Sequence, residues 1–364
     1  MNRIRVALLA GGRSSEHEIS LASARSVREA LDPERYEIVD VAIARDGRWQ
    51  LGPVPSGHDP LPGTASGPKE MVQSGHDPVP GTGSGPAETL PVPAEGGTLA
   101  ALGEVDVVLP ILHGPFGEDG TVQGMLELAD VAYVGPGVLA SALCMDKDVF
   151  KSVMRDNSVP VTRHKTLRLG DEVENPFGYP VFVKPARLGS SVGISKVRSE
   201  EELEPAVALA RRHDEKVLVE EFVPGTEIEV GVLGNLPRPQ ASLPGQVVSH
   251  LADWYDWASK YDEGGSELLI PPPGLSDDQL ARAQQLAVTA FVATECEGMA
   301  RADFFVREAD GGIVMNELNT IPGFTGTSFY ARLFDASGIP YEELVRRLID
   351  LALERQERRR GLEF

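Results

Sequence analysis

Hydrophobic and polar residues follow one another along this chain with periods that predict strands and helices in turn. Residues 4–10 form a continuous apolar run, which is typical of a strand buried on both faces of a parallel sheet. Apolar residues then recur at helical spacing from Leu21 to Leu31, and Ser15 with Glu18 predicts a capping box at the start of that helix. The chain therefore opens with a strand and an amphipathic helix.

The alternation of strands and helices continues through the first third of the chain, apart from one insertion. Further elements are expected at 36–44 (strand), 105–112 (strand), 121–129 (helix) and 131–135 (strand). Strands that alternate with helices predict an open parallel α/β sheet. The sequence 56–68 recurs almost unchanged at 74–86, inside a Pro-, Gly- and Ser-rich stretch at 52–98. Such a stretch buries too little apolar surface to offset its ordering entropy, so we expect a flexible duplicated insertion.

The remaining two thirds predict two further domains. Helices are expected at 136–157, from Ser276 with Gln279 completing a capping box, and from about Tyr341. Strands are expected at 216–223, 227–233, 299–306 and 312–318, and residues 181–197 have the pattern of a strand, a glycine-rich turn and a strand. The domain boundaries predicted from this order are 1–140, 141–222 and 223–364.

The net charge and the cysteines restrict the partners and the compartment. A net charge of −21 argues against a nucleic-acid partner, because phosphate binding requires a basic face. Cys144 and Cys296 have no spacing typical of metal sites or disulfide frameworks, which favours a reducing compartment. The start MNRIRVALLAGG superficially resembles a signal peptide, but its short apolar run leads straight into a helix start. No stretch approaches the roughly 20 apolar residues of a membrane span, so we expect a cytoplasmic protein with no membrane partner.

Oxygen-bearing side chains gather near the C-terminus. Glu317 and Asn319 are two residues apart on a predicted strand, so their side chains point to the same face. If that strand pairs with 299–306 as a hairpin, Asp303 lies beside them. Ligands that are all oxygen atoms suit Mg²⁺, which also binds substrate phosphates, better than they suit Zn²⁺. A strand at a polar edge of a sheet would show the same sequence pattern without binding a metal.

A glycine-rich loop and several charged residues suggest a nucleotide site. In RLGSSVGIS (187–195), glycines allow close approach to an anion and serines add donors, but no Gly-Lys-Ser/Thr of a Walker A loop follows. Lys184 precedes this loop inside an apolar strand, where burial of an ammonium requires an anionic partner. Glu220 and Glu227 flank a turn and are candidates for hydrogen bonds to an adenine amino group and ribose hydroxyls, although this motif by itself favours solvated carboxylates.

Taken together, motifs spread over the whole chain resemble the D-alanine–D-alanine ligase family. They are GGRSSEHEIS (11–20), HGPFGEDGTVQG (113–124), MDK (145–147), VKPARLGSSVGISKV (183–197), EEFVPGTEIEV (220–230), SKYDEGGS (259–266), RADFF (301–305) and NELNTIPGFTGTS (316–328). The resemblance covers everything except 52–98, where relatives commonly have a shorter connection. It implies the α/β (mixed α+β) three-domain ATP-grasp fold, with an N-terminal open parallel domain and ATP held between the other two.

The resemblance also implies a role for each matching residue. The ATP contacts would be Lys147, Lys184, Ser190, Ser191, Glu220, Glu221, Val223, Glu227 and Lys260. Within that set, the lysines and the loop would meet phosphates, Glu220 the adenine and Glu227 the ribose. The metal ligands would be Asp303, Glu317 and Asn319, holding two Mg²⁺ ions, with Mn²⁺ as a possible substitute.

The two D-alanine molecules would be bound and joined by a further set of residues. Substrate contacts would come from Glu16, His113, Arg301, Gly323 and Ser328, and the catalytic set would be Glu16, Ser190, Tyr261, Arg301 and Gly323. Tyr261 would link Ser190 with Glu16 when the site closes. Beyond the site, the family implies a homodimer and a role in peptidoglycan precursor synthesis.

Three other functions are weighed against this one. D-alanine–D-lactate ligases typically lack the tyrosine of the closing network, whereas this chain has Tyr261. Other ATP-grasp carboxylate–amine ligases would share the nucleotide and metal residues but not Glu16, His113 or Ser328. A non-catalytic nucleotide sensor on the same scaffold would be expected to have lost a metal ligand or a phosphate lysine, and all of them are present.

Overall fold

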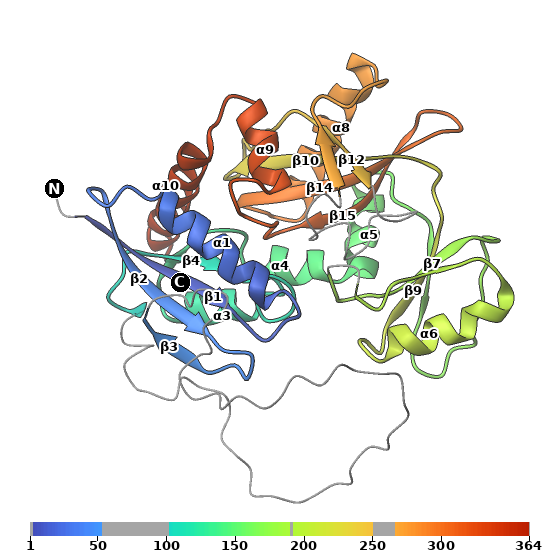
Figure 1. The fold of residues 1–364 in the computed structure, drawn as a ribbon, viewed down its shortest axis with the longest axis horizontal. Helices are drawn as coiled ribbons and strands as arrows, with labels where there is room; N and C mark the ends of the chain where they lie inside the picture. Colours follow the sequence, from blue (N-terminus) through green and yellow to red (C-terminus); the bar gives the residue numbers. More distant parts are fainter. Residues whose placement is uncertain (1–2, 53–101, 190–191, 250–265, 364) are drawn as a thin grey trace, which may run out of the picture.

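The computed structural model describes residues 3–52, 102–189, 192–249 and 266–363. The predicted insertion therefore lies, but for one residue, outside the described residues, as do Ser190, Ser191, Lys260 and Tyr261. Within the described residues the chain forms three sheets covered by helices, which gather into three groups of elements in space (Figure 1). The predicted mixed α/β fold is confirmed.

The first sheet has the strand order β3-β2-β1-β4-β5. Its strands are β1 (Ile4–Gly11), β2 (Tyr36–Ile43), β3 (Trp49–Leu51), β4 (Val107–Ile111) and β5 (Ala132–Tyr133). The pairs β1–β2, β1–β4 and β4–β5 are parallel, as the strand–helix alternation predicted. The short edge strand β3 is antiparallel to β2 because it follows through a tight turn rather than a crossover helix.

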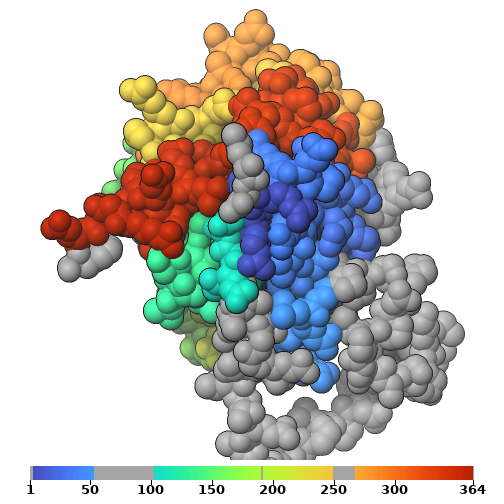
Figure 2. Space-filling model, turned by 90° about the vertical axis from the view of Figure 1, so that its left-hand side faces the viewer, coloured from blue at the N-terminus to red at the C-terminus, as the bar shows by residue number. Residues whose placement is uncertain are grey.

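Both faces of this sheet are covered, which explains why β1 is apolar from Val6 to Ala10. Val6 and Leu8 point into a core shared with α1 (His17–Ala30) and α10 (Tyr341–Arg360). Ala7 and Leu9 point into a second core beside α3 (Thr121–Leu128). The C-terminal part of the chain (red) thus lies against the N-terminal part (blue), as Figure 2 shows. The last helix of the chain thus covers one face of the first sheet.

The middle sheet is antiparallel and has a core of its own. Its order is β6-β9-β7-β8, from β6 (His164–Leu167), β7 (Val181–Pro185), β8 (Ser195–Val197) and β9 (Val217–Glu221). The 3-10 turn η1 (Glu200–Glu202) leads into α6 (Leu203–Arg211), which covers one face and packs Leu203 and Val207 against β7 and β9. This small unit lies at one side of the molecule, as Figure 1 shows.

The third sheet is antiparallel and carries the longest strands. Its order is β13-β12-β10-β14-β15, with β11 paired to β10. The strands are β10 (Gly225–Gly234), β11 (Gln240–Ala241), β12 (Gly245–Ser249), β13 (Ser266–Leu269), β14 (Gly298–Arg307) and β15 (Ile313–Asn319). The helix α8 (Asp277–Ala293) covers one face, and α9 (Phe329–Ala336) leads on towards α10. Phe150 and Met154, from the segment before the middle sheet, also belong to the core beneath α8.

Two predicted helix features were wrong. The single helix expected over 136–157 is two helices, α4 (Val138–Met145) and α5 (Lys147–Asp156), because Asp146 has an extended ψ of 95° and caps α5 with its side chain. The capping box of Ser15 and Glu18 does not form. Glu16 is the residue before α1, and the hydroxyl of Ser14 accepts the Glu16 N–H instead.

The predicted capping box of α8 is present: the Ser276 hydroxyl accepts the Gln279 N–H, and the Gln279 side chain accepts the Ser276 N–H. We expect Ser276→Ala to lower the free energy of unfolding by about 1 kcal/mol, because an orphan helix donor loses its partner. Ser199→Ala is a matched control, since Ser199 precedes η1 without a capping bond. Urea unfolding of both variants measures the difference, and equal midpoints would contradict the assignment.

The helices and cysteines add two findings on the described part of the chain. No helix there is both long enough and apolar enough to cross a membrane. Cys144 and Cys296 are both buried, and both are free thiols.

Candidate active site

The hairpin of β14 and β15 brings the predicted metal residues together. In its register Asp303 lies opposite Glu317, and Arg301 lies opposite Asn319. Cross-strand partners and residues two apart share a face, so all four side chains lie on one face of the sheet. A bulge makes Asn316 the extra residue of β15, because Phe304 pairs with Met315. The predicted hairpin is confirmed.

Arg301 lies between two carboxylates on this face. Its guanidinium donates two hydrogen bonds to Asp303, of 2.8 and 2.7 Å, in a bidentate arrangement. The same group lies 3.3 Å from the carboxylate of Glu229, which is fully buried on β10. The two carboxylates hold the plane of the guanidinium in one orientation. Lysine could not replace this arginine, because it lacks the pair of parallel N–H donors that a bidentate contact requires.

A cavity of about 380 Å³ adjoins the hairpin. The predicted residues that line it are Glu16, His113, Lys147, Arg301, Glu317, Asn319, Gly323 and Ser328. They come from the start of α1, the end of β4, the start of α5, the hairpin and the loop before α9. Segments that are distant in the sequence thus converge on one space.

Lys147 connects three parts of this cavity. Its ammonium donates to the carbonyl of Leu188 at 2.8 Å and lies 3.4 Å from a carboxylate oxygen of Glu317. Leu188 and Gly189 begin the glycine-rich loop, and a Cβ on Gly189 would lie 3.9 Å from the carboxylate of Glu16. The lysine, the loop and the first domain therefore face the same space.

Lys184 has the anionic partner that its apolar strand required. Its ammonium donates to Glu220 at 2.6 Å and to the amide oxygen of Asn316 at 3.2 Å, so it faces β15 beside Glu317. Glu220 also accepts a hydrogen bond from Lys151, which in turn donates to Thr162. Burial would raise the pKa of Glu220, but the ammonium groups of Lys151 and Lys184 outweigh it and hold that pKa at about 2.

The first domain is tied to the cavity through His113 and the loop before α9. The His113 ring shares a hydrogen bond of 3.0 Å between Nδ1 and the carbonyl of Ile321. Ser328, which precedes α9, accepts the N–H of Thr325 at 2.9 Å. The N–H of Gly326 donates to Ser26 of α1 at 3.0 Å, which fixes this loop against the first helix.

Three site residues were missed in the sequence. Glu118 lines the cavity and accepts the N–H of Gly114, and burial together with the charge of Glu16 raises its pKa to about 8. Lys151 lies one helical turn after Lys147, so its helical spacing was the available signal. Glu229 lies two residues after Glu227 on the same strand, and its alternation with apolar neighbours was the signal.

Part of the predicted ATP set does not line the cavity. Glu221 is engaged elsewhere, because its carboxylate accepts from the backbone and the side chain of Arg163 at 2.8 and 2.6 Å. Val223 and Glu227 are half-buried at the crossing from β9 to β10. Lys184 and Glu220 reach the hairpin through Asn316, whereas Glu227 lies opposite Phe305 of β14 in the pairing of β10 with β14.

The hairpin residues fit a hard divalent cation. Nowhere among the described residues do three His, Cys, Asp or Glu side chains form a ready metal site. The amide oxygen of Asn319, however, is buried without a hydrogen-bond partner among the described residues, and it lies on the sheet face that Glu317 and Asp303 share. An orphaned buried acceptor beside two carboxylates matches the oxygen ligands that Mg²⁺ takes.

Two family models match this chain over most of its length. The model described as D-ala D-ala ligase N-terminus matches residues 5–136, and that described as D-ala D-ala ligase C-terminus matches residues 149–350. The chain belongs to the D-alanine–D-alanine ligase family. The resemblance read from the sequence motifs is thereby confirmed, and the protein is a ligase.

Individual relatives of the D-alanine–D-alanine ligase family agree over the full length. A D-alanine–D-alanine ligase from Kineococcus radiotolerans is 48% identical over 96% of this chain and 97% of its own. The structure of the ligase from Coxiella burnetii has a TM-score of 0.76 at 32% identity, covering 99% of this chain and 97% of that one. The VanG D-Ala:D-Ser ligase from Enterococcus faecalis has a TM-score of 0.77 at 31% identity, covering 96% and 100%. The fold is thus common to ligases with different second substrates.

Proposed function

We propose that this protein joins two D-alanine molecules into D-alanyl-D-alanine, with conversion of ATP to ADP and phosphate. The observation that carries the proposal is the single cavity that collects Glu16, His113 and Lys147 with the charged face of the β14–β15 hairpin. Two small zwitterions and a polyanion require carboxylates for the ammonium groups, cations for the phosphates and oxygen ligands for a divalent metal ion, all at close range. This cavity has all three kinds of group.

The first step must activate a carboxylate, which is a poor electrophile. A carboxylate oxygen of the first D-alanine attacks the γ-phosphorus of ATP. The bond between that phosphorus and the oxygen bridging to the β-phosphate breaks, so ADP departs and D-alanine becomes an acyl phosphate. Since this brings an anion towards a polyanion, cations and alignment supply the catalysis. Lys147 and Lys184 would meet the phosphates, and Glu16 would hold the ammonium of the first D-alanine. Mg²⁺ held by Asp303, Glu317 and Asn319 would neutralise phosphate charge, and Mn²⁺ would fit the same ligands.

The second step forms the peptide bond. The amine of the second D-alanine, after losing a proton, attacks the acyl carbonyl, and inorganic phosphate leaves. Arg301 and the backbone near Gly323 would stabilise the oxyanion that develops, because fixed donors need no reorganisation at the moment of reaction. Ser328 would help to place the second D-alanine, and His113 would lie near the first. Closure of the site would keep water from the acyl phosphate.

Several further roles belong to the same proposal. Glu220 and Glu227 would bind adenine and ribose, with backbone contacts from Glu221 and Val223. Ser190, Ser191, Lys260 and Tyr261 would act in the closed site. The three-domain division is supported by the separate core of the middle sheet. We also propose a homodimer that works in the cytoplasm on peptidoglycan precursors, where free thiols such as Cys144 persist.

A substrate panel tests the reaction. Phosphate release from ATP is measured with D-alanine, L-alanine, or D-alanine together with D-lactate or D-serine, and the products are identified by mass spectrometry. We expect release with D-alanine alone and the dipeptide as the main product. A preference for the D-lactate ester or for D-alanyl-D-serine would replace the proposed second substrate, and a lack of D-alanine-dependent release would refute the ligase reaction.

The buried ion pairs of Glu220 predict a pH dependence of stability. Its folded pKa of about 2 lies below the ordinary value of 4.5, so its contribution is complete above pH 4.5 and is lost as pH falls towards 2. In the variant with Lys151→Met and Glu220→Gln, the free energy of unfolding should therefore fall less steeply over that window. Urea unfolding at several pH values measures the slopes.

An exposed ion pair provides the control for this experiment. Lys165 and Glu174 pair across the surface of the middle sheet and are 40% and 54% exposed. The variant with Lys165→Met and Glu174→Gln should keep the wild-type slope, because solvent screens an exposed pair. Equal slopes in all three proteins would show that Glu220 is not held ionised by its lysines.

A further inference from the structure

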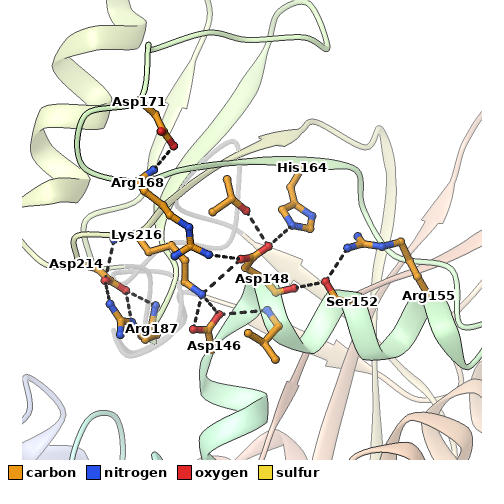
Figure 3. Close-up of polar contacts among 12 residues, drawn as sticks. Asp146, Asp148, Ser152, Arg155, His164, Arg168, Asp171, Arg187, Asp214 and Lys216 are labelled. Atoms are coloured by element: carbon orange, nitrogen blue, oxygen red, sulfur yellow. Dashed lines mark hydrogen bonds and ion pairs between the residues drawn. The ribbon is translucent and has the colours of Figure 1, made fainter.

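A polar cluster joins the start of α5 to the middle sheet, and none of the residues labelled in Figure 3 lines the cavity. Lys216, just before β9, is at its centre, and its ammonium donates to both carboxylate oxygens of Asp146 at 2.6 and 2.5 Å. The Lys216 side chain is only 8% exposed. A buried lysine with two short bonds to one carboxylate is held in a single arrangement, in contrast to an exposed ion pair.

Asp146 and Lys216 close a ring of contacts around the base of the glycine-rich loop. The backbone carbonyl of Lys216 accepts the N–H of Ala186 at 2.9 Å, and the carbonyl of Ala186 accepts the N–H of Lys147 at 3.0 Å. Lys147 follows Asp146 directly, so the side-chain pair completes the circuit. The backbone of Ala186 is thus hydrogen-bonded to both Lys216 and Lys147. Leu188, whose carbonyl accepts from the Lys147 ammonium, follows two residues later.

Neighbouring contacts hold both halves of this ring. On the loop side, Asp214 accepts from the backbone and the guanidinium of Arg187, at 2.8 and 2.6 Å. On the helix side, Asp148 accepts from Thr166 at 2.8 Å and shares a 3.2 Å bond with His164. These partners lie on β6 or beside β7 and β9, whereas the apolar face of α5 packs beneath α8. The cluster therefore joins two bodies that have separate cores.

We propose that Lys216, through its ion pair with Asp146, is a positioning residue for ATP binding: it holds Lys147 and the base of the glycine-rich loop in register with each other. The inference rests on the proposed function, in which Lys147 meets the phosphates. Without the pair, the Lys147 ammonium loses its fixed distance to Leu188 and Glu317. A displacement of about 1 Å at a charged contact changes rates on the order of 100-fold.

Two variants separate the ion pair from the helix cap. Lys216→Met removes the ammonium and keeps an unbranched apolar side chain. Asp146→Asn keeps a side-chain oxygen for the Val149 N–H, since asparagine caps helices as well as aspartate, but it removes the charge. Lys216→Arg retains the charge and should restore part of the function. Lys165→Met, which removes an exposed lysine from the same sheet, is the control.

The experiment measures the dissociation constant of ATP by calorimetry, together with KM for ATP, KM for D-alanine, kcat and Tm. We expect Lys216→Met and Asp146→Asn each to weaken ATP binding on the order of 10- to 100-fold, with KM for D-alanine within about twofold of wild type. The double variant should be no weaker than Lys216→Met alone, because Lys216→Met already removes the pair with Asp146, together with a 3.5 Å contact to Asp148.

Other outcomes would overturn the inference. If both variants bind ATP as wild type does, or if Tm falls while the ATP dissociation constant stays unchanged, the pair is merely structural. A double variant whose losses multiply would show that the two residues act separately. Failure of the proposed function is distinguishable, because the wild-type protein would then show no D-alanine-dependent phosphate release.

Discussion

Replacing Glu317 by glutamine is expected to lower kcat for dipeptide formation on the order of 100- to 1,000-fold, the range found when single electrostatic groups are removed from active sites. Glu317 is central to the candidate site, because it lies opposite Asp303, approaches the Lys147 ammonium at 3.4 Å and lines the cavity. Glutamine has the same shape but lacks the charge that would hold a divalent cation and orient the lysine. The coupled release of phosphate and dipeptide measures the loss.

The hairpin itself offers the control for Glu317→Gln. Asp310 lies at the turn between β14 and β15, where it pairs with Arg307, and it is exposed. Asp310→Asn removes one carboxylate from the same hairpin without touching the cavity, so its kcat should match that of wild type. Circular dichroism and Tm establish that both variants are folded. If the Glu317→Gln protein were fully active, the β14–β15 hairpin would not be part of the active site.

Much of the fold was readable from the sequence because its signals are local. The continuous apolar run of β1 follows from burial on both faces of a parallel sheet. The capping box at Ser276 forms as predicted because both partners lie within one helical turn. The two-residue spacing of Glu317 and Asn319, together with the expected hairpin, predicted that Asp303 lies on the same face, which the strand register confirms.

Long-range side-chain contacts were not readable in this way. The break between α4 and α5 falls at Asp146, whose carboxylate accepts a hydrogen bond from a lysine 70 residues further along the chain. The high pKa of Glu118 arises from burial beside Glu16, on another element. The sequence predicted that Lys184 has an anionic partner but not which residue it is. The partner is Glu220 on β9, the strand that pairs with β7. Such contacts depend on how separate elements pack, which periodicity does not encode.

The core between the first sheet and the last helix yields the second large prediction. Leu348 lies on α10, is 1% exposed and belongs to the cluster that also contains Val6 and Leu8 of β1. Leu348→Ala should lower the free energy of unfolding by about 2–5 kcal/mol, because the loss of buried methyl groups is compounded by the cavity left behind. Urea unfolding followed by far-UV circular dichroism measures the change.

A matched substitution separates burial from helix propensity. Leu128 ends α3 and is 93% exposed, so Leu128→Ala removes the same atoms from water rather than from a core. We expect its unfolding free energy to stay within about 0.5 kcal/mol of wild type. Because α10 covers the face of β1 from the opposite end of the chain, Leu348→Ala should also weaken the packing of the first sheet with α1, near Glu16 and His113. Increased hydrogen exchange in β1 and α1, as well as in α10, is therefore expected, and protection lost from α10 alone would show that the helix does not stabilise that sheet.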